Sequence, residues 1–470
     1  MRDISQQHVH LIGIGGAGLS AIARVLLEQG ARVSGSDLVI SPVAEALSRD
    51  GVRVYAGHAP EQVEGADIVV ASSAVPDDNV EIQAARALGI PVVGRPAFLG
   101  QMMEGKRGVA VAGTHGKTTT TAMIATILLE AERDPTFIVG GVVTDLETNA
   151  RAGTDPLFLI EADEYDCTFL SLKPDLAIIT NVEHDHPDCY PTFDAFRSAF
   201  ESFADMVPAD GLLAVCADDQ VASDIGRRRA EQPGASAGPS VRFFGLGDEA
   251  DWRAEEIQAN FAGGVDFLAV HRGETLGLVR LRVPGAHNAS NAMGAMAVTD
   301  RLGVPFSVTR EALRGFRGVA RRFEVKGEAG GVVVVDDYAH HPTEIRATLR
   351  AAKERYPERR IWAVWQPHTY SRTSELLGEF ATAFADADRV VVLPIYPARE
   401  TDTLGVSAEV VGAAIDRNET HVAGSLTEAW EWLRAAVRPG DAVLTLSAGD
   451  GNRVGERLLA ELGGQANAEG

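Results

Sequence analysis

The sequence predicts an α/β protein of three domains, each built around a mostly parallel sheet. A chain of 470 residues is long enough for about three domains. Short runs rich in valine and isoleucine alternate with helical stretches, which is typical of parallel sheets covered on both faces. Two glycine loops each lead from a strand into a helix. We expect a Rossmann-like domain over 1–106, a central P-loop domain over 107–318 and a Rossmann-like α/β domain over 319–470.

The first domain opens with a strand over 8–14 and a glycine loop. Gly13, Gly15 and Gly18 form a G-x-G-x-x-G motif. Asp37 ends the next strand, where a Rossmann fold places an acidic residue that binds a ribose or a base. The motif alone is a weak indication, because close packing of a strand on a helix also selects these glycines. The other elements expected here are a helix over 19–29, strands over 32–36, 52–55, 67–71 and 91–93, and a linker over 104–107.

The most informative segment runs from Val109 to Thr121 and reads VAVAGTHGKTTTT. A buried strand leads into a glycine loop and then into a helix, so backbone N–H groups and a helix N-terminus point at one phosphate. Lys117 supplies a point charge and Thr118 a ligand for Mg²⁺. Position 111 is valine where the standard P-loop has glycine, so this is a shorter GTxGKTT variant. The segment predicts ATP binding, and the two glycine loops together predict two phosphorylated ligands, or one cofactor and one nucleotide-linked substrate.

Acidic and imidazole groups follow two strands of the central domain. The sequence FLIEADE ends a strand in acids, and Glu161 is well placed to hold a metal beside the P-loop. The segment IITNVEHDHPD ends another strand with several polar groups, among them His186. Each group alone could cap a helix or face solvent, but together they indicate a divalent-metal site for phosphate chemistry. Strands are expected over 157–160, 176–180 and 212–215, and a polar surface loop with three arginines over 227–240.

The third domain also has polar groups after its strands. The segments VDDYAHHPTE, WQPHTYSRT and LSAGDGN follow three of them, and polar strand ends that face one direction outline a single cleft edge. Just before this domain, PGAHNASN opens an alanine-rich helix. Asn291 there could present its amide to an adenine ring, or merely cap the helix with its neighbours His287 and Asn288. The strands expected are 332–335, 361–365, 389–393 and 442–446.

The composition excludes several classes of protein. A net charge of −23 argues against nucleic acid as a partner, because phosphate backbones need a broad basic surface. No apolar run approaches about 18 residues and no signal-peptide pattern is present, so neither membrane spanning nor secretion is expected. Cys167, Cys189 and Cys216 lack metal-site or redox spacing. We expect a cytoplasmic protein with reduced thiols, and the sequence leaves monomer and homodimer open.

The chain resembles the Mur ligases of peptidoglycan synthesis in motifs that occur in the same order: GIGGAG, GTHGKTTT, EADE, TNVEHDHPD, HNASN, RRFE, DDYAHHPTE, QPHTYSRT and SAGD. The resemblance spans nearly the whole chain and implies that the first domain holds UDP, the second holds ATP, and closure of the third completes the active site. It implies an ATP- and Mg²⁺-dependent reaction in which the muramoyl carboxylate of UDP-N-acetylmuramate forms an acyl phosphate. The amine of L-alanine then attacks that carbonyl. Catalysis of this kind is mostly positioning and charge neutralisation.

The resemblance also implies roles for single residues. The UDP substrate would be bound by Gly13, Gly15, Gly16, Ala17, Gly18, Asp37 and Ser73. ATP would be bound by Gly113, Thr114, His115, Gly116, Lys117, Thr118 and Thr119, and by the more distant Asn291, Arg322, Asp337 and Tyr338. Thr118, Glu161 and His186 would hold metal near the transferred phosphoryl group. Lys117, Glu161, His186, His340 and Arg372 form the implied catalytic set, in which Arg372 holds the alanine carboxylate. His340 is either a base or a structural imidazole packed beside Asp337.

Two features depart from relatives of this kind. Where many members read QPHRYSRT, this chain has Thr369, so one of two arginines near the amino-acid site is missing. Because an arginine–carboxylate pair contributes roughly 1.5–3 kcal/mol, the site is weakened or relies on Arg372, and glycine and serine stay open beside alanine. Several relatives carry a carbamylated lysine that bridges two metal ions, but no lysine lies between Lys173 and Lys326. We therefore expect metal binding without a carbamate.

Three other functions stay open from the sequence. A nicotinamide-dependent dehydrogenase would explain the first glycine loop but would leave Lys117 without a role. A regulatory P-loop ATPase would explain Lys117 but not the arginine at the amino-acid site, and it would release phosphate without a second substrate. A murein-peptide recycling ligase shares most motifs, although its third domain usually lacks QPHxYSRT, and it would use a tripeptide in place of alanine.

Overall fold

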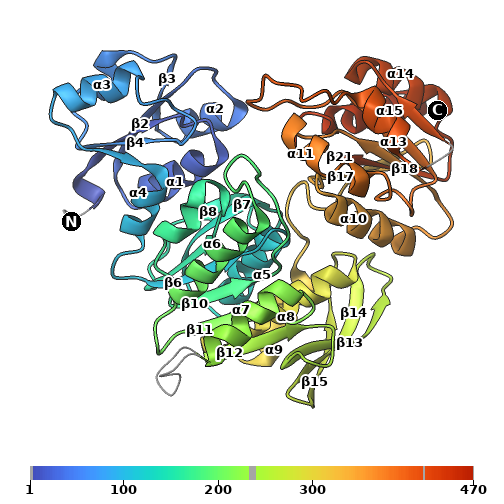
Figure 1. Ribbon diagram of the computed structural model, residues 1–470, viewed down its shortest axis with the longest axis horizontal. Coiled ribbons are helices and arrows are strands. Elements are labelled where there is room, and N and C mark those ends of the chain that lie inside the picture. Colours follow the sequence, from blue (N-terminus) through green and yellow to red (C-terminus); the bar gives the residue numbers. More distant parts are fainter. Residues whose placement is uncertain (1–3, 232–239, 417–418, 469–470) are drawn as a thin grey trace.

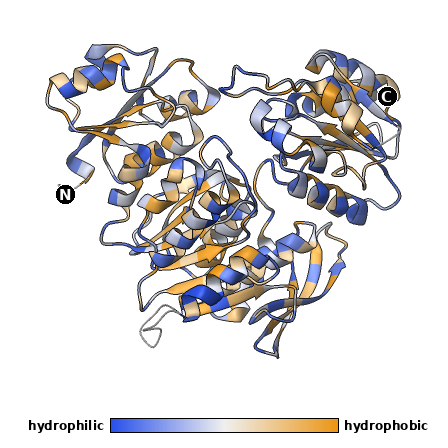
Figure 2. Ribbon diagram, in the orientation of Figure 1, coloured by the Kyte–Doolittle hydropathy of each residue, from blue (hydrophilic) through white to orange (hydrophobic). Residues whose placement is uncertain are grey.

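The computed structural model describes residues 4–231, 240–416 and 419–468 as three α/β domains in chain order, each around its own sheet (Figure 1). Apolar residues concentrate on the strands and on the helix faces that cover them (Figure 2). The predicted fold class, three domains with largely parallel sheets, is confirmed. No described helix is long and apolar enough to cross a membrane.

The first domain has a parallel sheet of five strands. They are β1 (His8–Ile12), β2 (Arg32–Asp37), β3 (Arg53–Ala56), β4 (Ile68–Ala71) and β5 (Val92–Gly94), in the spatial order β3-β2-β1-β4-β5. The helical segments are η1 (Ile4–Gln6), α1 (Ala17–Glu28), α2 (Pro42–Arg49), η2 (Pro60–Val63), α3 (Val80–Ala87) and α4 (Arg95–Met102). β1 is fully buried, and the strand order reverses on either side of it. The glycine loop after β1 therefore lies where doubly wound sheets bind ligands.

The central domain has a sheet of ten strands. They are β6 (Arg107–Ala112), β7 (Thr136–Val143), β8 (Thr148–Arg151), β9 (Leu157–Glu161), β10 (Leu176–Ile179), β11 (Leu212–Cys216), β12 (Ser240–Gly245), β13 (Trp252–Ala259), β14 (Val265–His271) and β15 (Glu274–Arg280), in the order β15-β14-β13-β12-β11-β10-β6-β9-β7-β8. The helical segments are α5 (Lys117–Glu130), η3 (Tyr165–Ser171), α6 (Phe193–Asp205), α7 (Gln220–Glu231), α8 (Ala286–Arg301) and α9 (Phe306–Gly315). Antiparallel strands, which the sequence analysis did not predict, extend both edges of the sheet.

One predicted loop of this domain is wrong. The arginines at 227–229 lie at the end of α7. Arg228 and Arg229 pair with Asp205 of the neighbouring helix α6. These ion pairs favour the continuation of α7 through the arginines. Ser240 already belongs to β12. The intervening residues 232–239 lie outside the described part of the chain.

The third domain has a sheet of six strands. They are β16 (Glu324–Ala329), β17 (Val332–Asp337), β18 (Arg360–Trp365), β19 (Arg389–Val392), β20 (Thr420–Val422) and β21 (Asp441–Leu446), in the order β16-β17-β21-β18-β19-β20. The helices are α10 (Pro342–Arg355), α11 (Tyr370–Glu375), α12 (Leu377–Phe380), α13 (Ala408–Ala414), α14 (Leu426–Ala436) and α15 (Asn452–Ala468). β17, β21 and β18 are parallel neighbours, so the three polar strand ends do share one edge of the sheet.

Polar contacts join the domains in sequence. Between the first and central domains, Arg95 donates to Asp163 and Thr168 at 3.1 Å each. Between the central and third domains, Thr343 Oγ1 donates to Glu183 Oε1 at 2.8 Å. The third domain therefore lies against the edge of the central sheet that carries the P-loop.

Candidate active site

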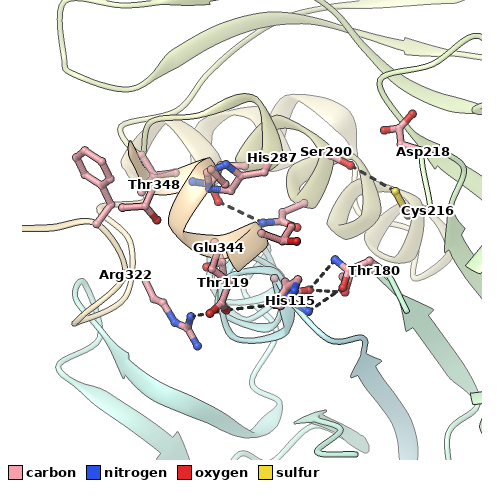
Figure 3. Close-up of a pocket in the computed structure, with 18 of the residues that line it drawn as sticks. His115, Thr119, Thr180, Cys216, Asp218, His287, Ser290, Arg322, Glu344 and Thr348 are labelled. Carbon is pink, nitrogen blue, oxygen red and sulfur yellow. Dashed lines mark hydrogen bonds and ion pairs between the residues drawn. The ribbon is translucent and has the colours of Figure 1, made fainter. Parts of the chain in front are cut away.

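A cavity of about 420 Å³ lies between the central and third domains (Figure 3). The P-loop, α8 and the first turns of α10 contribute to its walls. The predicted ATP-binding residues that line it are His115, Gly116, Thr119, Asn291, Arg322 and Asp337, whereas Gly113, Thr114, Lys117, Thr118 and Tyr338 do not. Other lining residues were not predicted from the sequence, among them Asp218, Phe244, Leu246, Phe323 and Glu344. Apolar walls with a few polar groups are typical of a pocket for a small ligand.

The P-loop conformation requires glycine. Gly113 has a φ of +138°, and a Cβ there would lie 1.9 Å from Thr180 Oγ1. The end of β10 holds the loop, because Asn181 O accepts from Thr114 N at 3.0 Å and Asn181 Oδ1 accepts from His115 N at 2.8 Å. The neighbouring strand end therefore helps to set the shape of the loop.

Lys117 is paired with a carboxylate that the sequence analysis did not single out. Its Nζ donates to Gly113 O at 2.5 Å and to Thr114 O at 3.0 Å, and it lies 2.8 Å from Glu164 Oε2. The Glu164 side chain is only 2% exposed. Although burial opposes its ionisation, Lys117 and His186 hold the pKa of Glu164 below its usual value. Glu164 is the second glutamate of the EADE motif, so the motif did contain the signal.

The residues predicted to hold metal lie at the start of α5 and at the ends of β9 and β10. Thr118 Oγ1 donates to Glu161 Oε1 at 3.0 Å, and Gly140 N donates to Glu161 Oε2 at 2.6 Å. Burial raises the pKa of Glu161. His186 Nε2 lies 3.5 Å from Glu164 Oε1. A hydroxyl, two carboxylates and an imidazole thus surround the position of Lys117.

His115 connects the central domain to the third. Its Nδ1 lies 3.3 Å from Glu344 Oε1 of α10, and its Nε2 lies 2.8 Å from Glu183 Oε2 (Figure 3). Glu344 also lies 3.5 Å from Arg322. Burial alone would lower the pKa of His115, but Glu183 and Glu344 raise this pKa to about 9. Ligand atoms of His115, Glu183 and His341 lie within 4.8 Å of one another, a spacing that would also admit a metal ion.

The stability of the protein should depend on the proton of His115. Its pKa rises from 6.5 to about 9, so the stabilisation is complete below about pH 6.5 and is lost as the pH rises through about 9. We expect the free energy of unfolding of the wild-type protein to fall between pH 7 and pH 9, and that of His115→Gln to fall less. Urea unfolding of both proteins across this range measures the difference. Parallel curves would contradict the interaction.

Arg372 and Asp185 form a buried ion pair between the two domains. Nε and Nη2 of Arg372 lie 2.9 and 2.7 Å from Asp185 Oδ1, and the two side chains are 7% and 5% exposed. Burial alone would raise the pKa of Asp185, but Arg372 holds this pKa far below its usual range. The pair could not be predicted from the sequence, because the two residues lie 187 positions apart.

His340, Asp337 and Tyr338 lie at the end of β17. His340 Nδ1 is 3.0 Å from Tyr338 O and 3.3 Å from Glu344 Oε2. Asp337 accepts hydrogen bonds from two backbone N–H groups, and the Tyr338 ring lies 5.0 Å from the Arg322 guanidinium. Burial lowers the pKa of His340 to about 3, which makes it a weak base in this arrangement.

The residues predicted to bind UDP remain in the first domain, and none of them lines the cavity. Asp37 Oδ2 accepts a hydrogen bond from Gly15 N at 2.8 Å, so Asp37 holds the glycine loop. Ser73 follows β4 and is exposed. Gly13 follows β1 directly and has a φ of +87°. The rest of the motif, Gly16, Ala17 and Gly18, forms the N-cap and first turn of α1.

Three family profiles match the chain in succession. They are the Mur ligase family, catalytic domain, over 8–107, the Mur ligase middle domain over 111–299, and the Mur ligase, glutamate ligase domain, over 321–449. They cover the P-loop, the strand ends that hold it and the polar edge of the third sheet.

Similar proteins carry ligase names. A UDP-N-acetylmuramate–L-alanine ligase of Geobacter sp. (strain M21) is 43% identical, with 97% of this chain and 98% of the relative aligned. The solved structure of a UDP-N-acetylmuramate-alanine ligase from Thermotoga maritima has a TM-score of 0.80 at 29% identity, and covers 98% of this chain and 100% of its own. A murein peptide ligase from Psychrobacter arcticus has a TM-score of 0.72 at 27% identity, covering 97% and 99%. On this similarity, which extends over nearly its full length, the chain belongs to the Mur ligase family.

Proposed function

We propose that the chain is an ATP-dependent ligase that joins L-alanine to the muramoyl carboxylate of UDP-N-acetylmuramate, releasing ADP and phosphate, in cytoplasmic peptidoglycan precursor synthesis. The observation that carries the proposal is the meeting of the P-loop with two third-domain segments. The segment DDYAHHPTE contributes Glu344 to the wall of the cavity. The segment QPHTYSRT contributes Arg372, which pairs with Asp185 after a strand of the central domain. The names of the relatives support the same reaction.

ATP binds in the cavity with its phosphates along the P-loop. Lys117 exchanges Glu164 for phosphate oxygens and neutralises the β- and γ-phosphates. Asn291 faces the adenine, and the apolar side chains of Phe244 and Leu246 line the same cavity. Arg322 approaches from the third domain, with one Nη 3.5 Å from Thr118 Oγ1. These groups position the γ-phosphate for attack by the muramoyl carboxylate, which yields the acyl phosphate.

Mg²⁺ fits the donor set, because Thr118 and Glu161 offer oxygen atoms beside the P-loop. When bound, the ion would supply charge neutralisation at the transferred phosphoryl group. His186 is the third proposed ligand and must be neutral to bind a metal. Burial alone would lower the pKa of His186, but Glu164 and Asp185 raise it, so protonation of this ring competes with metal binding.

The other two substrates lie on either side of the phosphates. The UDP moiety is held by the glycine loop at 13–18 and by Asp37 and Ser73. L-Alanine lies beside Arg372 and His340, and its amine attacks the acyl phosphate as phosphate leaves. In this proposal the domain over 1–106 binds the UDP moiety and the domain over 107–318 binds ATP. The domain over 319–470 binds the amino acid and closes over the nucleotide.

An assay of ADP release with UDP-N-acetylmuramate, ATP and Mg²⁺, supplied with each amino acid in turn, tests the proposal. We expect turnover with alanine and a product whose mass equals UDP-N-acetylmuramate plus one alanyl residue. Turnover with tripeptide but not alanine would replace the proposal with a recycling ligase. ADP release without an amino acid would favour an ATPase, and binding of NAD with no ligase activity would favour a dehydrogenase.

Activity should not depend on dissolved CO₂. Lys173 is exposed and lies 2.9 Å from Glu104 near the first domain, so it is committed to an ion pair outside the metal-binding residues. Turnover in CO₂-stripped buffer, with and without added bicarbonate, measures the dependence. A loss of activity that bicarbonate restores would contradict the expectation.

A further inference from the structure

A fully buried carboxylate lies in the core of the first domain. The side chain of Glu81, in the first turn of α3, is 0% exposed. Burial alone would raise its pKa, but the neighbouring His10 imidazole and Ser36 hydroxyl hold this pKa below its usual value. An acidic residue is almost never fully buried unless other groups compensate its charge. The groups that surround Glu81 therefore indicate what this carboxylate does in the fold.

Glu81 connects β1, β2 and the loop after β3. Its Oε2 accepts a hydrogen bond from Ser36 Oγ of β2 at 2.5 Å, and its Oε1 accepts one from Ala59 N, after β3, at 3.4 Å. Two imidazoles lie against the same carboxylate. His10 Nε2 of β1 is 3.6 Å from Oε2, and His58 Nδ1, also after β3, is 3.3 Å from Oε2. Both carboxylate oxygens are therefore bound, and three neighbouring parts of the sheet depend on them.

Ser36 links this carboxylate to the glycine loop. Its hydroxyl is bound to Glu81, and its backbone oxygen accepts a hydrogen bond from Gly13 N at 2.8 Å. The next residue, Asp37, accepts from Gly15 N through its Oδ2 at 2.8 Å. Hydrogen bonds thus connect Glu81 to Ser36, and the backbone of Ser36 together with its neighbour Asp37 to the first half of the loop.

The glycine loop has little room to move relative to these residues. A Cβ on Gly15 would lie 2.8 Å from Asp37 Oδ2 and 3.0 Å from Ser41 Oγ, so the loop backbone passes directly against both side chains. Loops of this type bind phosphate groups through their backbone, which requires a fixed geometry. A displacement of Ser36 and Asp37 is therefore transmitted to the loop.

We propose that Glu81 is a positioning residue of the UDP-binding site. It is buried and does not touch the substrate, but it fixes Ser36 and, through Ser36 and Asp37, the glycine loop over 13–18 that receives the UDP moiety. The inference rests on the proposed ligase function and adds a residue that acts on the affinity for the nucleotide-linked substrate. Glutamine has the same shape but only one acceptor oxygen, so it loses one of the two hydrogen bonds that Glu81 accepts.

Binding of UDP and steady-state kinetics of Glu81→Gln test the proposal. We expect the Kd for UDP, measured by isothermal titration calorimetry, and the KM for UDP-N-acetylmuramate each to rise about 10-fold, as for loss of one hydrogen bond to a charged group. The KM values for ATP and alanine, which bind elsewhere, should change less than about 2-fold.

Ser36→Ala removes the hydroxyl that lies between Glu81 and the loop, so it should raise the same two constants. Because both variants break one series of hydrogen bonds, their effects should not multiply. The double variant should bind UDP about as well as the weaker of the two single variants. If Glu81→Gln fails to fold, Ser36→Ala alone gives the decision.

Asp441→Asn is the matched control, because Asp441 is a buried carboxylate that joins strands of the third domain. Its Oδ2 lies 2.8 Å from Arg360 Nη2 and accepts from Trp362 Nε1 at 3.0 Å. This variant should lower the melting temperature, as loss of a buried ion pair does. Its Kd for UDP should stay within about 2-fold of the wild-type value, because the two sites share no partner.

Each outcome decides between alternatives. An unchanged Kd for UDP in both Glu81→Gln and Ser36→Ala, with UDP binding by the wild-type protein present, overturns this inference and leaves the proposed function intact. An equal rise of the KM values for all three substrates assigns Glu81 a purely structural role and also overturns it. Effects that multiply in the double variant exclude Ser36 as the link and overturn it as well. Absence of UDP binding and of alanine-dependent ADP release in the wild-type protein overturns the proposed function itself.

Discussion

Replacing Lys117 with alanine is expected to lower kcat by about 10²- to 10³-fold, because one preorganised charge-stabilising group contributes about 2.7–4 kcal/mol to the barrier. The carbonyl oxygens of Gly113 and Thr114 hold the Lys117 ammonium within the P-loop, beside the proposed phosphate site. Single-turnover measurement of ADP formation at saturating ATP measures the loss. Near-normal turnover with an unchanged circular dichroism spectrum would contradict the assignment of the ATP site.

The same variant should also be less stable. Without Lys117, the Glu164 carboxylate is left buried, with the His186 imidazole 3.5 Å away as its remaining partner. Removing one partner of a buried ion pair costs about 3–5 kcal/mol. The double variant Lys117→Met, Glu164→Gln removes both charges, so it should recover stability without recovering activity. Thermal unfolding of the three proteins separates the catalytic effect from the structural one.

Replacing Arg372 with alanine is expected to raise the KM for alanine far more than the KM for ATP. The variant leaves the Asp185 carboxylate uncompensated and buried beside the proposed amino-acid site, so its repulsion of the substrate carboxylate adds to the loss of the cation. Breaking such a pair should also lower stability by about 3–5 kcal/mol. Steady-state kinetics with each substrate varied, together with denaturant unfolding, measure both effects.

Asp185→Asn is the informative counterpart. It leaves the Arg372 guanidinium without its carboxylate, so the alanine KM should not rise even though stability falls. Equal increases in the ATP and alanine KM values for Arg372→Ala would place Arg372 at the nucleotide. A rise of the alanine KM in Asp185→Asn as large as in Arg372→Ala would show that the pair acts only by joining the domains.

The local features of the site were predictable because they depend on residues close together in the chain. The P-loop, its strand β6 and its helix α5 lie within 107–130, where strand, glycine and helix signals follow one another. The polar strand ends of β17, β18 and β21 were predictable for the same reason. The antiparallel strands at the edges of the central sheet were not predicted, because strands joined in hairpins lack the alternation of strand and helix that indicates a parallel sheet.

The partners of the charged residues were not predictable. Lys117 and Glu164 lie 47 positions apart, and Arg372 and Asp185 lie 187 apart. Glu344 ends the DDYAHHPTE motif, where the sequence alone assigned it no role, yet it contacts His115 of the central domain and Arg322 of its own domain. Conversely, His340 matches an amino-acid-site position, but burial makes it a weaker base than the sequence suggests.

The sequence by itself determined the three α/β domains, the phosphate-binding loop and the chemical class of the residues at the strand ends. These follow from hydrophobic periodicity and from glycine and threonine spacing, which act over a few residues. Only the tertiary structure decided which carboxylate neutralises which cation and how far burial lowers the pKa of each imidazole. The physical reason is that pKa values and net charge in a site are set by burial and by charges a few ångströms away, and packing between domains brings those charges from distant parts of the chain.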